Sequence, residues 1–503
     1  PAVCGRICNR RCEDACTRGT VDQAVAIDEV KRFIAQQDLD AATRFVPEKV
    51  IPKVDGEFGE KIAVIGAGPA GMSCAFYLAE KGYRPTVFEK EERPGGMLMN
   101  GIPSFRLEKD VVEAEIDILR EMGVEFRCGV EVGKDVTIAQ LREEGYQGFY
   151  VAVGLQSGGR LNIPGGEAQG VQAGIDFMRH VNSGLCSKMS GRVVVIGGGN
   201  IGADVARTAL RCGADSVDLY CLEGYEDMPM GEEDRGECER EGITIHAGWG
   251  QTEIVEQDGK CAGIRFRKCL SVKNAEGRFD PKFDDAVTEE TACDMVLYCI
   301  GQKVEWKALL TGTKVEFNPN GTVKADPVTY QTAEPDIFVG GDAYTGQKFA
   351  IDAIAAGKQG AVSLHRWVQH ATLTIGRDRR QFIELDKENA LIAIDSYDNT
   401  PRQQIGYNEA LRKTFRDERI AFTEEQVKKE TARCLGCGAS IVDPNKCIGC
   451  GICTTKCAFD AIHLHRERPE CSTMYKCEDK MKAILPYMIK RNFKIKRAAR
   501  KSK

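Results

Sequence analysis

The sequence lacks the features of a membrane or secreted protein. No apolar run reaches the roughly 18 residues that a transmembrane helix needs, and the start has no signal-peptide pattern. We therefore expect a cytoplasmic protein without a membrane span. Because the first residue is Pro1 and a cysteine motif follows almost at once, we expect the sequence to be part of a longer polypeptide.

Other classes of site are also missing from the sequence. The six histidines show no H-E-x-x-H motif or paired-ligand spacing, so we predict no zinc site. The formal net charge of −6 gives no general attraction to nucleic acid, although residues 490–503 are strongly basic. For this tail, a solvated end and a surface for an acidic partner both remain open.

A glycine motif follows the first apolar strand. Residues 62–65 predict a buried strand, residues 69–81 a helix, and residues 85–88 a second strand. The loop has the G-x-G-x-x-G spacing that lets a pyrophosphate approach a helix N-terminus, and the acidic residue after the second strand can accept hydrogen bonds from a ribose. The residues predicted to bind this first dinucleotide are Gly66, Gly68, Pro69, Ala70, Gly71, Glu89 and Lys90.

The same pattern recurs at residues 192–223, which predicts a second dinucleotide site. Its candidate residues are Gly197, Gly199, Asn200, Ile201, Gly202 and Glu223. Two such sites in one chain favour FAD in one and a nicotinamide cofactor in the other, with hydride transfer where they meet.

The segments before and after the second site indicate which cofactor binds at which site. The stretch PGGMLMNGIP follows the first site, and GGDAYTG with a small-residue helix comes after the second. An Asp at a strand end and a helix N-terminus suit the ribityl-phosphate part and the ring of a flavin. We therefore assign FAD to the first site, with Gly95, Gly96, Gly341, Asp342, Ala350 and Ile351 as further contacts.

Twenty-two cysteines gather mainly at the two ends of the chain. A disulfide framework is a poor explanation for a large chain without secretion signals, and short regular spacings favour iron–sulfur ligation. At the N-terminus, the predicted ligands are Cys4, Cys8, Cys12 and Cys16. Buried free thiols on one helix face are the alternative there.

The strongest single motif lies near the C-terminus. The run C-x₂-C-x₂-C-x₃-C of bacterial ferredoxins is formed by Cys447, Cys450, Cys453 and Cys457. Cys434 and Cys437 resemble half of a second run, with Cys471 and Cys477 as candidates for a missing ligand. We expect two or more [4Fe-4S] clusters in the chain. One cluster at this end, with Cys434 and Cys437 as bystanders or as ligands shared with a partner, remains an alternative.

Taken together, these motifs resemble one family of flavin and iron–sulfur oxidoreductases. It includes the small subunit of glutamate synthase, the large subunit of the electron-bifurcating NADH-dependent ferredoxin:NADP oxidoreductase, and the N-terminal half of dihydropyrimidine dehydrogenase. The stretches that carry the resemblance are CGRICNRRCEDAC, IGAGPAG, GGMLMNGIPSFRLEKDVV, YVAVG, IGGGNIGADVARTAL, GGDAYTG and AIDAIAAGKQGA. The resemblance implies FAD at the first and last of the nucleotide motifs and a nicotinamide cofactor at the middle one.

The sequence departs from this family at two positions. Members that use NADPH place two arginines just after the strand of the second site, where this chain has Leu222 and Glu223. A carboxylate there repels a 2′-phosphate and accepts from a free hydroxyl, so we favour NAD(H) over NADP(H). In some members a Glu or Gln on the next helix is a cluster ligand, and that position falls near Lys31, which cannot ligate iron. The family's earlier cysteine group is also absent, so either it lies upstream of Pro1 or the N-terminal segment holds one cluster.

The expected fold is α/β, with two Rossmann-like domains of the disulfide-reductase type and iron–sulfur segments at both ends. The expected domain limits are a helical N-terminal iron–sulfur segment at 1–55, FAD-binding parts at 56–165 and 316–372, an inserted NAD(P)H domain at 166–315, a linker at 373–430, a ferredoxin-like domain at 431–480, and a basic tail at 481–503.

We expect an NAD(P)H-dependent oxidoreductase subunit that passes a hydride to FAD and single electrons to [4Fe-4S] clusters. Expected acceptors are partner subunits or ferredoxin in a hetero-oligomeric complex. No catalytic acid or base is predicted, because hydride transfer between cofactors needs none. A self-contained reductase of a small organic substrate and a passive electron relay are alternatives. A dithiol reductase is disfavoured because neither the PGGMLMNG stretch nor the inserted domain contains C-x-x-C or C-x₄-C.

Overall fold

The computed structural model describes residues 1–47, 58–185, 188–377, 397–437, 442, 446–457, 462–464 and 480–501. They fall into two units, Pro1–Asp378 with Glu384–Cys437, and Arg379–Ile383 with Gly438–Lys503. A search of these described residues finds no helix that could cross a membrane.

The first sheet of the larger unit is fully parallel. Its order is β15-β4-β1-β2-β3. The strands are β1 (Lys61–Ile65), β2 (Thr86–Glu89), β3 (Glu125–Cys128), β4 (Tyr146–Val151) and β15 (Ile337–Val339). All but the first residue of β1 are buried, as its apolar run predicts.

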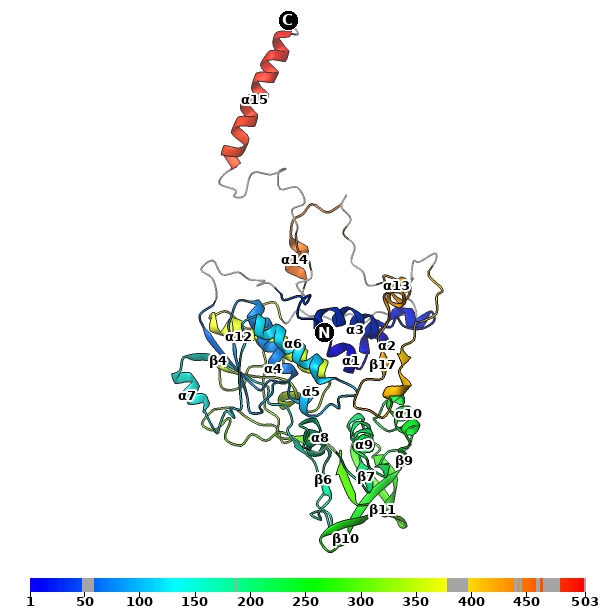
Figure 1. The fold of residues 1–503 in the computed structure, drawn as a ribbon. Helices are drawn as coiled ribbons and strands as arrows, with labels where there is room; N and C mark the ends of the chain where they lie inside the picture. Colours follow the sequence, from blue (N-terminus) through cyan, green and yellow to red (C-terminus); the bar gives the residue numbers. More distant parts are fainter. Residues whose placement is uncertain are drawn as a thin grey trace. The chain divides into compact units, whose positions relative to one another are not determined.

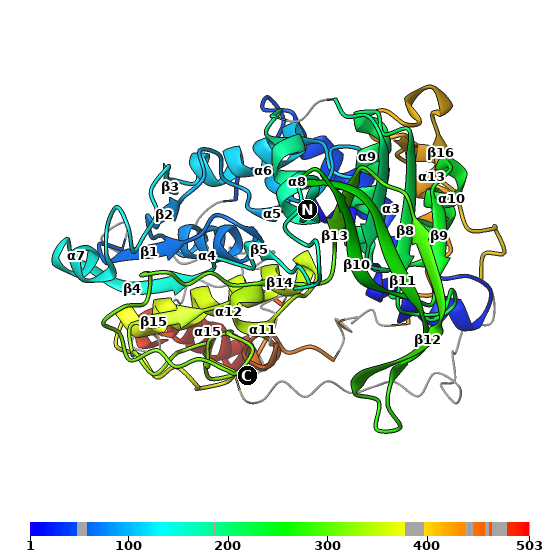
Figure 2. The same cartoon turned by 90° about the horizontal axis from the view of Figure 1, so that it is seen from below.

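Helices cover one face of this sheet, as Figures 1 and 2 show. The covering helices include α4 (Pro69–Glu80), α6 (Lys109–Glu121) and α12 (Ala350–Val368). Helices α4 and α12 approach closely at Gly357, where an added Cβ would lie 2.3 Å from the Ala70 carbonyl oxygen. The other face packs against residues 304–344, including Leu309 and Val323.

The second parallel sheet lies between β4 and β15 in the sequence and has the order β6-β13-β7-β8-β9. Its strands are β6 (Val171–Ala173), β7 (Arg192–Ile196), β8 (Ser216–Cys221), β9 (Thr244–Ala247) and β13 (Met295–Tyr298). Helices α8 (Gly174–Asn182) and α9 (Asn200–Cys212) pack on one face. An antiparallel meander, β10 (Trp249–Gln257), β11 (Lys260–Lys273) and β12 (Phe279–Thr291), packs on the other.

This arrangement confirms the expected α/β fold, in which one nucleotide-binding domain is inserted into another. Shorter elements complete the body. They are α5 (Met97–Asn100), α7 (Ile138–Glu143), α10 (Glu232–Glu241), α11 (Asp342–Thr345), β5 (Ser157–Gly158) and β14 (Gln302–Lys303).

The N-terminal segment packs against residues 397–437, a stretch within which the sequence predicts mainly a linker. The N-terminal elements are α1 (Cys4–Ile7), α2 (Arg11–Asp14), η1 (Thr17–Thr20), α3 (Ile27–Gln36) and η2 (Gln37–Leu39). The later elements are β16 (Gly406–Tyr407), η3 (Glu409–Leu411), β17 (Arg419–Ile420) and α13 (Glu424–Ala432). Figure 1 shows α13 and β17 beside α3.

Arginines buried at their contact, and Glu430, hold these two segments together, and the Glu430 carboxylate accepts a hydrogen bond from the Ala26 N–H at 2.8 Å. Arg433 is 1% exposed, and its guanidinium pairs with Glu430 at 2.7 Å and with Asp22 at 3.0 Å. Arg18, also 1% exposed, donates a hydrogen bond to the Arg433 carbonyl oxygen at 2.9 Å. Because removing one partner of a buried pair leaves an uncompensated charge, this contact fixes α13 on the N-terminal segment.

In the smaller unit, the described elements are α14 (Ile452–Lys456) and α15 (Lys480–Lys501).

Candidate functional site

The first glycine loop leaves the start of α4 open to a ligand. No side chain caps this helix, and an added Cβ at Gly68 would meet nothing within 4 Å. The Gly66 N–H donates to the Phe88 carbonyl oxygen at 2.8 Å, which fixes the loop on β2. At Gly71 an added Cβ would lie 1.9 Å from the Gly66 carbonyl oxygen. Gly71 therefore serves helix–strand packing, and the open helix end suits a pyrophosphate.

Glu89 stands at the end of β2, beside this loop. Its carboxylate accepts hydrogen bonds from the N–H groups of Ala67 at 2.7 Å and Glu91 at 3.0 Å. Burial raises the pKa of Glu89 above its usual value, although both N–H groups oppose the shift. The side chain thus braces the loop as well as lining the cavity beside it.

The last flavin motif lies at the end of β15. Burial raises the pKa of Asp342 to about 6, and its carboxylate accepts from the Lys348 N–H at 3.3 Å. Ala350 begins α12, which Asp352 caps by accepting from the Phe349 N–H at 3.2 Å. A cavity runs along all these segments.

Most residues predicted to bind FAD line that cavity: Gly66, Gly68, Pro69, Ala70, Glu89, Lys90, Gly96, Gly341, Asp342 and Ala350. Three of the predicted residues are not among its lining residues, namely Gly71, Gly95 and Ile351.

The second glycine loop repeats the geometry of the first. Helix α9 also starts at an uncapped glycine, Gly199, and an added Cβ at Gly202 would lie 2.1 Å from the Gly197 carbonyl oxygen. The cavity is lined by Gly197, Gly199, Asn200, Ile201 and Glu223, whereas Gly202 packs beneath the loop.

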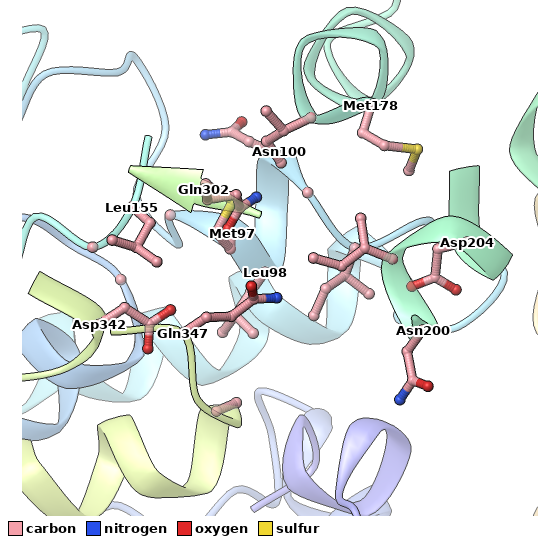
Figure 3. A pocket seen from close by; sticks show the side chains of 18 of the residues that line it. Met97, Leu98, Asn100, Leu155, Met178, Asn200, Asp204, Gln302, Asp342 and Gln347 are labelled. Atoms are coloured by element: carbon pink, nitrogen blue, oxygen red, sulfur yellow. The ribbon is translucent and has the colours of Figure 1, made fainter. Parts of the chain in front are cut away.

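Both loops open into one continuous cavity of about 1610 Å³. Figure 3 shows Asp342 and Gln347 on one side, Asn200 and Asp204 on the other, and Met97 between them. Single small-molecule sites usually measure roughly 300–1,000 Å³. The cavity therefore has room for two cofactors, and its open helix ends and ribose-side carboxylates fit FAD and a nicotinamide dinucleotide.

The segment between the two loops is held by side chains that no motif revealed. Lys109 donates through its ammonium to the carbonyl oxygens of Leu98 at 2.9 Å and Ile102 at 2.5 Å. The Asn182 amide, from α8 of the inserted domain, donates to the carbonyl oxygens of Asn100 at 3.0 Å and Ile102 at 3.2 Å. Side chains of both domains thus hold the turn at residues 98–102, which lines the middle of the cavity, by hydrogen bonds.

A buried ion cluster links the same two domains. Arg106, just after this turn, pairs with Asp204 of α9 and with Asp234 of α10 at 2.5 Å. Burial raises the pKa of Asp204 even though Arg106 opposes the shift. No sequence motif indicates this pairing, because Asp204 and Asp234 lie 98 and 128 residues after Arg106.

The N-terminal cysteine segment forms part of the cavity wall. Cys8 lines the cavity, Cys4 and Cys16 are partly buried, and Cys12 is exposed. Burial raises the pKa of the Cys4 thiol. The Arg11 guanidinium binds both Asp352 oxygens, at 2.9 and 3.2 Å. The segment is therefore fastened to the cavity end of α12.

The other cysteine group stands partly in each unit. Cys434 and Cys437, both exposed, follow α13 in the larger unit. In the smaller unit, Cys447 and Cys450 precede α14, Cys453 lies on it, and Cys457 ends it. Cys471 and Cys477 lie outside the described residues.

The cysteine thiols present here support cluster ligation by their chemistry, and the structure does not bring the described thiols together around one point. Among the described residues, no three His, Cys, Asp or Glu side chains are placed to hold one metal ion. The four thiols of residues 447–457 have the chemistry and spacing that a [4Fe-4S] cluster requires. At the position of a family ligand, the Lys31 ammonium pairs instead with Asp28 at 2.5 Å.

One close thiol pair lies away from the cavity. Cys261 and Cys293 are buried in the inserted domain with their sulfurs 3.7 Å apart, and neither lines the cavity. This pair therefore does not supply a dithiol beside the flavin site.

Two nucleotide-binding domains, each built on a parallel sheet, surround a shared cavity. This arrangement defines an oxidoreductase that brings two dinucleotides together. Residues 60–360 match the family model of the pyridine nucleotide-disulphide oxidoreductases, and the chain belongs to this family. Residues 1–43 match a model described as dihydropyrimidine dehydrogenase domain II, 4Fe-4S cluster, and residues 440–463 match a 4Fe-4S binding domain.

Curated relatives confirm the resemblance inferred from the sequence. The chain is 33% identical to the NADP(+)-dependent formate dehydrogenase subunit beta of Moorella thermoacetica over 86% of this chain and 65% of that protein. It is 31% identical to the glutamate synthase (NADPH) small chain of Escherichia coli K12, over 73% and 81%. It is 30% identical to the NAD-dependent dihydropyrimidine dehydrogenase subunit PreT of the same strain, over 74% and 82%.

A solved structure agrees on the fold. FprA from Mycobacterium tuberculosis aligns over 62% of this chain and 85% of its own, with a TM-score of 0.54 and 18% identity. The family models and the curated relatives make the chain an NAD(P)H-dependent flavin and iron–sulfur oxidoreductase.

Proposed function

We propose that the chain is the nicotinamide-oxidising subunit of a larger redox assembly. FAD at the first loop would accept a hydride from NADH or NADPH at the second, and [4Fe-4S] clusters would carry single electrons to a partner subunit or ferredoxin. The observation that carries this proposal is the single cavity lined by both glycine loops and by Cys8.

The residues of the chain would hold and orient the cofactors. The uncapped starts of α4 and α9 would bind the two pyrophosphates, with Glu89 and Glu223 at the respective riboses. The turn gripped by Lys109 and Asn182 would keep the two rings at a fixed separation. No side chain needs to move a proton for the hydride to transfer.

The predicted ligand assignments support this account residue by residue. The proposed FAD and nicotinamide contacts are the predicted residues that line the cavity, without Gly71, Gly95, Ile351 and Gly202. The proposed cluster ligands are Cys4, Cys8, Cys12, Cys16, Cys434, Cys437, Cys447, Cys450, Cys453 and Cys457.

We propose NADH as the favoured donor. Glu223 lines the second site directly after β8, and Glu232 and Glu233 add negative charge to the same cavity wall. A 2′-phosphate would be repelled there. The relatives include proteins named for NADP(+), NADPH and NAD, so the preference rests on these carboxylates.

Anaerobic titration tests the donor and the flavin role together. NADH should bleach the flavin and then produce cluster EPR signals, and NADPH should do so only at much higher concentration. Reduction by NADPH alone would overturn the donor assignment, and reduction of the flavin by neither would overturn the function.

Glu223→Gln sharpens this test. Loss of a charged hydrogen bond to the ribose should weaken NADH binding by on the order of tenfold and weaken NADPH binding far less. The matched control is Glu226→Gln, because the Glu226 side chain is 84% exposed and does not line the cavity. If the two variants show the same donor preference as the parent, Glu223 does not read the ribose.

The chain spans 65% of the length of the formate dehydrogenase relative, so its place in an assembly is part of the proposal. Several relatives are named as subunits, which supports a hetero-oligomer. A self-contained reductase of a small organic substrate would instead turn over with NADH and that substrate without any added electron acceptor.

A further inference from the structure

Helix α15 carries charge of one sign only. Its 22 residues contain nine lysines and arginines and no acidic residue. It also contains Pro486, which removes one backbone hydrogen bond from its first half. Such a helix is costly to maintain alone in water, because like charges repel along its length and helix propensity alone is marginal.

The side chains of α15 divide into two opposite stripes. Large apolar side chains on one helix face are exposed: Met481 (63%), Leu485 (51%), Met488 (45%) and, two turns further on, Ile495 (53%). Tyr487, Ile489 and Phe493 are also exposed and widen this stripe to its two sides. The opposite face presents Lys490, Lys494, Arg497 and Lys501. The apolar stripe and the basic stripe therefore run along the same helix on different sides.

Two further cations flank the apolar stripe. By helical spacing, Arg491 lies at one border of this stripe and Lys496 at the other. Long cationic side chains at such borders can lay their aliphatic stems along an apolar layer while their charges stay at its polar boundary. A flat surface with anionic groups above an apolar interior is complementary to this helix. Its interior can contact the apolar stripe while its anionic groups contact the cations at both borders.

We propose that α15 lies on an anionic lipid surface, with its apolar stripe in the acyl boundary and its cations among the headgroups. Amphipathic helices with this division of side chains bind in the plane of a membrane. Nine cations exclude a spanning orientation, because charged side chains are costly in the bilayer core. The proposed lipid contact does not depend on the proposed reaction.

Vesicle sedimentation of the full chain tests this contact directly. The protein should pellet with vesicles of phosphatidylcholine mixed with phosphatidylglycerol and remain in the supernatant with phosphatidylcholine alone. Raising the salt to about 1 M, where the screening length falls to about 3 Å, should weaken binding strongly. Equal binding to both vesicle types, or none to either, overturns the proposal.

Variants separate the two stripes. The basic-stripe variant replaces Lys490, Lys494, Arg497 and Lys501 with Gln. Affinity should fall roughly fivefold for each cation removed. The matched control replaces the exposed lysines Lys260, Lys273, Lys282 and Lys324 with Gln. It has the same net charge and should bind as the parent does.

The apolar stripe has its own variant, Met488→Ser with Ile495→Ser, which should lower vesicle affinity while keeping all nine cations.

Equal losses in the basic-stripe variant and the matched control would overturn the proposal, since net charge alone would then explain binding. Binding to poly-glutamate without binding to anionic vesicles would assign α15 to an acidic protein groove instead.

Discussion

Lys109 should make the stability of the larger unit depend on pH in a way that one substitution removes. Burial, followed by the positive charge of Arg93, lowers the pKa of Lys109 to about 7 in the folded chain. Its ammonium sits against two backbone carbonyl oxygens, those of Leu98 and Ile102. In an unfolded chain the same group titrates at about 10.4.

The sign follows from comparing the two states. Between the folded and unfolded pKa values the unfolded chain holds a proton that the folded chain has released, so the free energy of unfolding rises with pH. The slope approaches about 1.4 kcal/mol per pH unit, which gives a gain of about 2 kcal/mol between about pH 7 and pH 9. Below the folded pKa both states are protonated and the gain is absent.

The assay is urea unfolding of the FAD-loaded chain at several pH values, under reducing conditions. Other titrating groups also contribute, so the quantity to compare is the difference in slope between the parent and Lys109→Met. The variant should lose the gain of about 2 kcal/mol, and Lys273→Met, at an exposed position, should keep it. Identical slopes for the parent and Lys109→Met would refute the reasoning.

Three further substitutions test separate parts of the structure. Gly71→Ala places a Cβ 1.9 Å from the Gly66 carbonyl oxygen, and flavin absorbance of the purified protein should show FAD binding weakened on the order of tenfold or more. Arg433→Met removes the cation from the buried Glu430 carboxylate and should cost about 3–5 kcal/mol in urea unfolding, whereas Lys428→Met, at a side chain that is 73% exposed, should cost less than about 1 kcal/mol; equal costs would count against the buried pairing. Cys453→Ser should lower the iron content by about one cluster while NADH still bleaches the flavin; unchanged iron would remove Cys453 from the ligands.

The sequence predicted the parts of the site that are local in the chain. Strand, glycine loop, helix and acidic residue follow one another within some 30 residues, so the β1–α4–β2 unit around Gly66 could be read from spacing alone. The same holds for β7–α9–β8 around Gly197. The same spacing made Gly71 and Gly202 candidate dinucleotide contacts, whereas in the structure each has its Cβ position against a loop carbonyl oxygen and serves helix packing.

Contacts between distant segments could not be predicted in this way. Arg106 meets Asp204 only because the inserted domain folds back onto the first one. Arg433 meets Asp22 across 411 residues, which is why the stretch before it reads as a linker in the sequence. A single sequence carries no periodic or spacing signal for such pairs, since each partner alone is an ordinary charged residue.

The two cysteine groups differ in how they relate to the cavity. Cys8 belongs to the cavity wall, and its neighbour Arg11 is bound to Asp352, the residue that also caps α12 at the flavin end. A shift of the N-terminal segment would therefore disturb the start of α12 and with it the flavin side of the site. The run from Cys447 to Cys457 belongs to the other unit. Loss of an N-terminal thiol should consequently alter the flavin spectrum, whereas loss of a thiol from the later run should not.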